Sequence, residues 1–211
     1  MLVPGSRRVP GSKVEITMPE TDGQLYIRYV KENDTEAFRY IYEKYRDALI
    51  LFLNGIVGNI DDAEELMMDT FAILSSRTVK YREKEDAGFK TWLYAIAKNR
   101  AKMFLRKHKT MFSLPEDDEM NSEELAEGSA DTSPEESLIK EEQNRELYTA
   151  LESLDSDTRQ VLYLMYFEDL KPPEISRIMK KNIKQIYNLT ARGKTALKST
   201  LERMGYSWDM S

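Results

Sequence analysis

The stretch that decides the fold is PPEISRIMKKNIKQIYNLTARGKTALKSTLERM, residues 172–204. Two prolines open a short helix, because proline suits the first helical positions, where a backbone N–H is not needed. Ile175 and Ile178 recur at helical spacing and predict a buried face. The polar run 180–182 indicates a tight turn, and a longer helix follows from Ile183 to about Met204. A short helix, a tight turn and a longer helix predict a helix-turn-helix unit.

The longer helix has two faces of different chemistry. The inward face repeats apolar or small residues at helical spacing: Ile186, Leu189, Gly193, Leu197 and Leu201. The residues that we expect to contact DNA in a major groove are Lys184, Gln185, Tyr187, Asn188, Ala191, Arg192 and Lys194. Asparagine can form paired hydrogen bonds with adenine and arginine with guanine, while lysine can hold phosphate. The alternative is an amphipathic helix with an ordinary solvated face.

Helical periodicity extends over most of the remaining chain. We expect helices from Asn33 to about Gly55, from Asp61 to about Leu74, from Phe89 to about Lys107, from Ser133 to about Leu154 and from Ser156 to about Phe167. Asn, Asp and Ser at the starts of these segments are residues that commonly cap helix N-termini. No alternation of apolar and polar residues with period two appears, so the sequence predicts an all-α protein.

Charge divides the chain into blocks. Residues 77–109 hold eleven Lys and Arg against three acids, residues 111–141 hold eleven acids against one lysine, and residues 171–203 hold nine basic residues against two acids. The acidic segment has too few apolar residues to offset the entropy of ordering. We therefore expect two small helical domains, 23–110 and 133–206, joined by a flexible acidic linker at 111–132. Residues 1–22 are expected to be a sequence added for expression and a disordered N-terminus, because MLVPGSRRVPGS repeats Val-Pro-Gly-Ser.

The composition of this chain of 211 residues excludes several common kinds of catalytic site. It has no cysteine and a single histidine, His108, which removes thiol nucleophiles, disulfides and Ser-His-Asp triads. The acidic cluster at 61–69 matches no calcium-loop spacing, and acids already suit the first turn of a helix. No run approaches the length of a membrane-spanning helix. We expect a soluble, cytoplasmic protein that is not an enzyme, has no cofactor or metal, and does not insert into a membrane.

The helix starting at Phe89 is the second candidate for nucleic-acid binding. Lys98, Lys102 and Arg106 are spaced to share one face, with Asn99 beside them. Cations next to aromatic rings suit single-stranded nucleic acid, since bases stack while phosphates are neutralised. Tyr81, in the preceding loop, is the aromatic residue that we expect to contact a base, whereas Trp92 repeats with the apolar stripe and is expected to be core.

The two halves together resemble a known family. The first half carries Asp62-Ala63-Glu64-Glu65-Leu66 followed by Asp69 and Phe71, and then Phe89-Lys-Thr-Trp92-Leu93-Tyr-Ala-Ile96-Ala97-Lys-Asn99. The second carries Arg159 to Leu162 and Glu174-Ile175-Ser-Arg-Ile178, leading to Ile186 and Arg192. In this order they resemble an extracytoplasmic-function, or group IV, sigma factor of bacterial RNA polymerase.

The resemblance implies a function and a set of contacts. The first domain would bind the clamp helices of core polymerase, and the expected contacts are Asp62, Glu65, Leu66, Met68 and Asp69. It would help to melt the −10 promoter element, with Tyr81, Lys98, Asn99, Lys102 and Arg106 on single-stranded DNA. The second domain would read the −35 element and meet the polymerase flap, and an anti-sigma factor would regulate the whole.

Some positions depart from the family pattern. Met68 stands where the family often has glutamine, Leu189 replaces a frequent basic residue, and the 180–182 turn lacks glycine. The promoter sequence therefore does not follow from the pattern.

Two other classes compete with the sigma-factor interpretation. A stand-alone helix-turn-helix regulator would dimerise to read paired half-sites, but no apolar dimer face is visible. A protein-binding helical adaptor leaves both basic faces unexplained. DNA binding measured with and without core polymerase separates the three.

Overall fold

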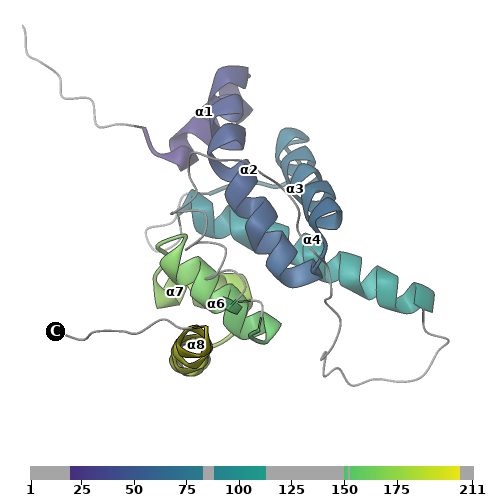
Figure 1. The fold of residues 1–211 in the computed structure, drawn as a ribbon. Coiled ribbons are helices and arrows are strands. Elements are labelled where there is room, and N and C mark those ends of the chain that lie inside the picture. The colour runs from purple at the N-terminus through teal and green to yellow at the C-terminus, as the bar shows by residue number, and fades with distance from the viewer. Residues whose placement is uncertain (1–19, 83–87, 113–149, 152, 205–211) are drawn as a thin grey trace, which may run out of the picture.

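The computed structural model describes residues 20–82, 88–112, 150–151 and 153–204. Within these ranges the chain forms seven α-helices and no strand, which confirms the all-α prediction (Figure 1). Among the described residues, no helix is both long and apolar enough to cross a membrane.

The first half contains four helices. They are α1 (Asp22–Glu32), α2 (Thr35–Val57), α3 (Ile60–Ser75) and α4 (Phe89–Phe112). The sequence did not predict α1, which begins inside the segment assigned to a disordered N-terminus. A capping box at its start, in which Thr21 and Gln24 exchange side-chain and backbone hydrogen bonds, explains why it begins there. Residues 1–19 lie outside the described residues.

Three helix caps differ by one or two residues from those expected. Asn33 does not cap α2; it ends α1 with a φ of 59°, and the Asp34 side chain accepts the N–H groups of Glu36 and Ala37. The other two shifts are Asn59 in place of Asp61 at α3, and Asp155 in place of Ser156 at α6. Each prediction chose a residue that suits a cap, but a neighbour of the same chemistry occupies the extended conformation that capping requires.

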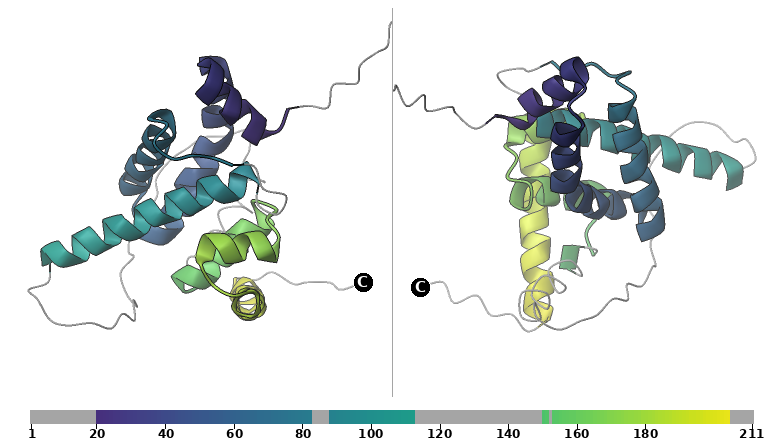
Figure 2. Two further views of the ribbon diagram at one scale, coloured as in Figure 1. Left: turned by 180° about the vertical axis from the view of Figure 1, so that it is seen from behind. Right: turned by 90° about the horizontal axis from the view of Figure 1, so that it is seen from above.

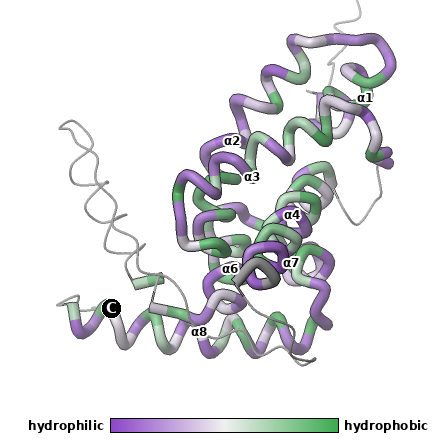
Figure 3. The backbone as a smooth tube through the Cα atoms, turned by 90° about the vertical axis from the view of Figure 1, so that its right-hand side faces the viewer, coloured by the Kyte–Doolittle hydropathy of each residue, from purple (hydrophilic) through white to green (hydrophobic). Residues whose placement is uncertain are grey.

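The second half contains the expected helix-turn-helix. Helix α6 spans Ser156–Tyr166, α7 spans Pro172–Met179 and α8 spans Ile183–Arg203. Lys180 ends α7 in the left-handed conformation, with a φ of 54°, and Asn182 caps α8. Along α8 hydrophilic and hydrophobic residues alternate at each turn (Figure 3). The expected acidic linker and most of the helix expected from Ser133 lie outside the described residues.

The two halves pack against each other in this structure. Helices α6 and α7 contact α2 and α4, and α8 lies on the side of α6 and α7 away from α4 (Figures 1 and 2). One buried cluster runs across both halves, with Phe52 between Tyr94 of α4 and Tyr163 of α6. The far end of α4 projects beyond the other described helices (Figure 2). The larger buried cluster of the described helices therefore spans both halves, and a smaller cluster of Leu151, Leu154 and Leu162 lies within the second half.

Candidate nucleic-acid interface

Helix α8 presents the face that the sequence predicted. All seven expected DNA contacts on it are exposed: Lys184, Gln185, Tyr187, Asn188, Ala191, Arg192 and Lys194. On the opposite side Ile186, Gly193 and Leu201 are buried and Leu189 and Leu197 are half-buried. The prediction of which face is inward is confirmed, and the outward face is open to a partner.

Gly193 fixes how closely α8 lies on α6. A Cβ atom added there would stand 2.6 Å from Thr158 Cγ2 and 2.8 Å from Leu162 Cδ1. A larger residue would clash unless α8 or these side chains moved, so the glycine allows the close approach of the two helices.

Three of the α8 candidates already have partners within the protein. The Gln185 side chain accepts the Asn182 backbone N–H at 2.8 Å as part of the helix cap. Arg192 lies 3.3 Å from Asp155, the cap residue of α6, and the ammonium of Lys194 sits 5.4 Å from the ring centre of Tyr166. Arg192 and Asp155 are both largely exposed, so this ion pair is weak and exchanges readily for another partner.

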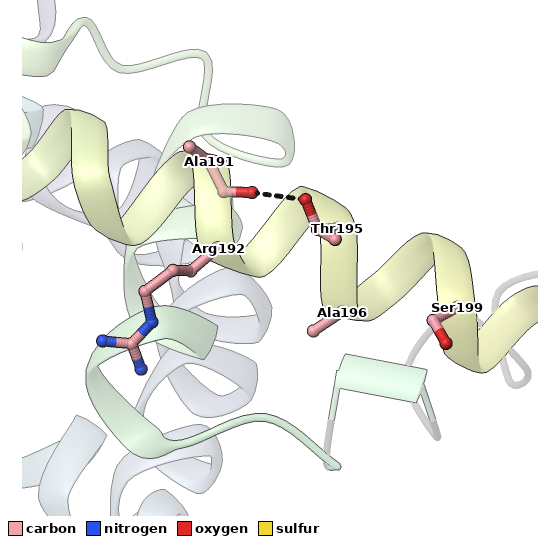
Figure 4. Close-up of a pocket in the computed structure, with 5 residues that line it drawn as sticks. All are labelled: Ala191, Arg192, Thr195, Ala196 and Ser199. Carbon is pink, nitrogen blue, oxygen red and sulfur yellow. Dashed lines mark hydrogen bonds between the residues drawn. The ribbon is translucent and has the colours of Figure 1, made fainter.

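A shallow depression lies beside Arg192 on α8. Its lining residues are Ala191, Arg192, Thr195, Ala196 and Ser199, and the Thr195 hydroxyl donates back to the Ala191 carbonyl at 3.1 Å (Figure 4). Apart from Arg192, these residues have small side chains, so little protrudes from the helix surface here. A bulky partner such as a DNA backbone can therefore approach α8 closely here.

On α4 the four expected contacts divide into two pairs. Lys102 and Arg106 are exposed on the outer part of the helix. Lys98 and Asn99 lie where the second half contacts α4, although Asn99 itself stays exposed. Lys98 is half-buried and donates to the Gln160 side chain of α6, and Asn99 accepts from Lys180 Nζ at 3.0 Å.

The setting of Lys98 changes its charge equilibrium. The pKa of Lys98 is lowered to about 8, chiefly by burial; Asp157 acts in the opposite direction, and the neighbouring cations Lys181 and Lys102 contribute to the lowering. Moving Lys98 into water would remove the burial that disfavours its charged form.

Tyr81 belongs to an aromatic cluster rather than standing free in a loop. Its ring centre lies 5.2 Å from that of Trp92 and 5.5 Å from that of Phe89. Trp92 is only partly buried, and Tyr26 packs against it at 5.3 Å. The cluster holds Tyr81 at the surface next to the start of α4.

Helix α3 carries the expected polymerase contacts. Glu65 and Met68 are exposed, Asp62 is half-buried, and Asp69 forms an ion pair with Arg100 of α4. Leu66 is not brought to this surface, because it is buried in the core with 2% of its area exposed. The described residues hold no group of three or more His, Cys, Asp or Glu side chains placed to bind a metal.

Several residues that join the two halves were not singled out from the sequence. Glu168 is 7% exposed and lies 3.1 Å from Lys90 Nζ, and Glu174 accepts from the Thr91 hydroxyl at 3.2 Å. Tyr94 of α4 is fully buried as well. Burial of these residues depends on contacts between segments about 80 positions apart, which helical periodicity does not report.

Comparison with known families agrees with this arrangement. The pattern of Sigma-70 region 2 matches residues 41–110, and that of Sigma-70, region 4 matches residues 144–197. The matches cover α4 and the helix-turn-helix, which carry the two candidate DNA surfaces. The chain belongs to the sigma-70 family.

Curated relatives place this sigma factor in the extracytoplasmic-function group. It is 27% identical to the ECF RNA polymerase sigma factor SigW of Bacillus subtilis, over 83% of this chain and 94% of that protein. It is 24% identical to the ECF RNA polymerase sigma-E factor of Escherichia coli, over 85% of this chain and 94% of the relative.

Two solved structures share the fold of this sigma factor. CnrH in complex with the cytosolic domain of CnrY aligns with a TM-score of 0.58 at 17% identity, covering 87% of this chain and 99% of that one. The sigma factor RpoE of Bartonella quintana, in complex with the anti-sigma factor NepR, aligns with a TM-score of 0.53 at 20% identity, covering 78% of this chain and 96% of that one.

Membership of the sigma-70 family establishes the general function of this protein. This sigma factor binds the RNA polymerase core and directs it to promoters, and it is not itself an enzyme.

Proposed function

We propose that the steps of promoter recognition are divided among three surfaces of this sigma factor: α8 reads the −35 element, α4 with Tyr81 helps to open the −10 element, and α3 contacts the polymerase clamp helices. The observation that carries this proposal is the outward face of α8, where every predicted DNA contact is exposed at the second helix of a helix-turn-helix.

Readout of the −35 element would divide between base and phosphate contacts. Asn188 and Arg192 are four residues apart, so they project from the same side of α8, and both can form paired hydrogen bonds with base edges. Lys184 and Lys194 lie toward the margins of this face, where phosphates border a groove. Gln185 would also contact the −35 element while its side chain continues to cap α8.

Opening of the −10 element would use the basic face of α4. Lys102 and Arg106, toward the C-terminal end of α4, would offer charge to phosphates, and Lys98 and Asn99 would extend that surface toward the start of the helix, where Tyr81 packs on Trp92. An aromatic ring at the edge of a cationic face gives an unpaired base a platform for stacking. The polymerase, not this chain, carries out the chemistry of RNA synthesis.

Contact with polymerase would involve α3 and the second half. Asp62, Glu65 and Asp69 give α3 an acidic surface that repels DNA, and Met68 adds an exposed flexible apolar side chain that adapts to a protein partner. The second half would meet the flap. Leu66 supports this surface from beneath, through its packing in the core.

The remaining features of the proposal concern regulation and setting. The chain would work in the cytoplasm as two domains, 23–110 and 133–206, joined by the flexible acidic segment at 111–132. An anti-sigma factor would control it; the Bartonella quintana structure is one example of such a complex.

Reconstituted transcription tests the proposal. The full chain is added to core polymerase and to a library of promoter fragments, and start sites are mapped by run-off. We expect specific initiation that needs both proteins, with much weaker specific DNA binding by the chain alone. Tight specific binding by the chain alone to paired half-sites would instead support a stand-alone regulator.

A further inference from the structure

Helix α1 meets Tyr81, the aromatic residue proposed to contact a −10 base, at a glycine. Gly23 is buried in the first turn of α1. A Cβ atom added to Gly23 would stand 2.6 Å from the Tyr81 hydroxyl oxygen and 2.8 Å from Cε1 of the ring. Atoms do not approach this closely without a clash, so a side chain at position 23 would have to displace Tyr81 or α1. Gly23 therefore makes room for the hydroxyl end of Tyr81.

Aromatic neighbours hold the rest of the Tyr81 ring. Its centre lies 5.2 Å from that of Trp92, 5.5 Å from that of Phe89 and 6.3 Å from that of Tyr26, and the last two contacts are edge-to-face. Edge-to-face geometry is favourable for aromatic pairs. The Tyr81 side chain is nevertheless only half-buried, so part of it is open to a partner. These rings and Gly23 together fix the position of the tyrosine without covering it.

The start of α1 is anchored to α2 next to Gly23. Both carboxylate oxygens of Asp22 accept hydrogen bonds from the Lys44 ammonium, at 2.7 and 2.8 Å, and the Tyr45 hydroxyl donates to one of them. Hydrogen bonds between charged groups are stronger than neutral ones, and this carboxylate is half-buried. Because residues 22 and 23 are adjacent, these bonds hold the Gly23 backbone at a fixed place relative to α2.

Two tyrosines tie the rest of α1 to the end of α3, from which the chain leads to Tyr81. Tyr26 donates to the Leu74 carbonyl at 3.0 Å, and Tyr29 donates to the Ser75 carbonyl at 3.1 Å. Tyr81 follows Ser75 by six positions. Helix α1 therefore contacts the chain both where it leaves α3 and where it presents the Tyr81 ring.

We propose that Gly23 and Asp22 are positioning residues for promoter opening: α1, anchored through Asp22, holds the Tyr81 ring against Gly23, where an unpaired −10 base can stack on it. The inference rests on the proposed function, because it takes Tyr81 to contact that base. A ring that is already held in place loses less conformational freedom when a base stacks on it, which raises affinity for the opened strand. The matched pattern of region 2 begins at residue 41, so both positioning residues lie outside it.

A double-mutant cycle between positions 23 and 81 tests the proposal. Holoenzyme is assembled from core polymerase and the full chain carrying Gly23→Ala, Tyr81→Ala or both. Gly88→Ala is the matched control, because its added Cβ atom would meet nothing within 4 Å. Binding is measured with a fluorescent single-stranded oligonucleotide of mixed sequence, since stacking tolerates any base, and the signal of core polymerase alone is subtracted. Affinity of each chain for core polymerase is measured separately.

We expect Gly23→Ala and Tyr81→Ala each to weaken oligonucleotide binding by about tenfold, the size of effect that loss of one stacked base produces. The double variant should bind no more weakly than Tyr81→Ala alone, because Gly23 acts through Tyr81. Gly88→Ala should bind normally, and affinity for core polymerase should stay the same in all variants. Additive losses in the double variant, or a lowered affinity of Gly23→Ala for core polymerase, overturn the positioning role.

The single variants separate this proposal from the proposed function. If Tyr81→Ala binds the oligonucleotide as tightly as the unaltered chain, Tyr81 is not the base contact, and the −10 part of the proposed function fails together with the positioning role. If Tyr81→Ala binds weakly while Gly23→Ala behaves like Gly88→Ala, only the positioning role is overturned.

A milder variant keeps the test decisive if Gly23→Ala loses helical content in circular dichroism. Asp22→Asn removes the charge that holds Lys44 and introduces no clash. It should weaken oligonucleotide binding in the unaltered chain but not in the chain with Tyr81→Ala. Simple electrostatics predicts tighter binding instead, because an acid has been removed near DNA. Tighter binding, or an equal effect in both chains, overturns the proposal.

A spectroscopic measurement reports directly on the position of the Tyr81 ring. The chain has two tryptophans, so Trp208→Phe leaves Trp92 as the only site for a fluorotryptophan label. Gly23→Ala should shift the fluorine resonance of Trp92, because the ring that packs on it is displaced. The same substitution should cause no shift in the chain with Tyr81→Ala. An unshifted Trp92 resonance in Gly23→Ala shows that Tyr81 has not moved and overturns the proposal.

Discussion

The hydroxyl of Tyr163 in α6 donates a 2.8 Å hydrogen bond to the backbone carbonyl of Ala48 in α2. The two residues are 115 positions apart, one in each half of the chain. The Tyr163 ring also packs on Phe52, with ring centres 6.0 Å apart. One side chain therefore supplies both an apolar and a polar contact between region 4 and region 2.

Removing this hydroxyl should weaken the packing of the halves by a small, measurable amount. We expect Tyr163→Phe to lower the free energy of unfolding by about 1 kcal/mol, the usual net contribution of such a bond. Urea denaturation followed by circular dichroism measures this change. Tyr166→Phe, an exposed tyrosine of the same helix, is the control and should be neutral. An equal loss in both variants would contradict the assignment.

Base readout by α8 predicts two different mutant behaviours. Asn188→Ala or Arg192→Ala should each cost about 1–3 kcal/mol in binding of the holoenzyme to the cognate promoter, and less on promoters altered at the contacted base. Lys184→Ala should weaken all sequences alike and reduce the salt dependence by about one ion. Filter binding of holoenzyme across a salt series separates the two. Unchanged promoter preference in the first two variants would mean that specificity lies elsewhere.

Charge reversal on α3 should affect polymerase binding. Glu65→Lys places a cation on the proposed contact surface and should lower affinity for core polymerase by about tenfold, or about 1.4 kcal/mol. Glu65 is a cleaner target than Asp69, whose replacement also breaks the ion pair with Arg100. Glu43→Lys, exposed on α2, makes the same charge change away from α3. If both reversals behave alike in a pull-down, the contact is not on α3.

The lowered pKa of Lys98 makes the packing depend on pH. Its pKa is about 8 when packed, against an ordinary value of 10.5, so separated molecules bind more protons between these values. Packing should therefore strengthen as the pH rises from about 8 to about 10.5 and be insensitive to this group at lower pH. Energy transfer between dyes on Glu43→Cys and Ser199→Cys follows the separation. The chain with Lys98→Met should lose this part of the pH dependence, and an identical profile in both chains would refute the origin assigned to it.

The close crossing of α6 and α8 gives a prediction for stability. Gly193→Ala would push a Cβ atom to within 2.6 Å of Thr158, so we expect a loss of about 1–3 kcal/mol from overpacking. Gly88→Ala, where the added atom would meet nothing within 4 Å, should be nearly neutral. Thermal unfolding compares the two. A neutral Gly193→Ala would show that the helices separate at no cost.

The sequence predicted α8 correctly, because the spacing of apolar residues within this one stretch determines which face of the helix is inward. The inward and outward faces, the turn at 180–182 and the start at Ile183 all follow from residues within one stretch of sequence. Prediction was weaker for caps, where Asn33 and Asp34 are chemically similar and only the backbone conformation decides between them.

Contacts between the halves were beyond the reach of sequence pattern. Tyr94 lies among basic residues in sequence, and its burial depends on Phe52 and on the approach of α6. From the sequence, Lys98 is expected to be a solvated cation, whereas in the structure its ammonium donates a hydrogen bond to Gln160. Periodicity reports which face of a helix is apolar, but not which distant segment covers a polar one.

The hydrogen bond from Lys180, at the end of α7, to Asn99 of α4 links the two halves, and this has a consequence for how such a protein evolves. If Asn99 contacts DNA as proposed, a substitution there that changes promoter binding also removes or alters this contact with the second half. A compensating change at Lys180 would then fall in the turn before α8, the helix proposed to read the other promoter element. On that proposal, changes in promoter choice and changes in the contact between the halves would evolve together.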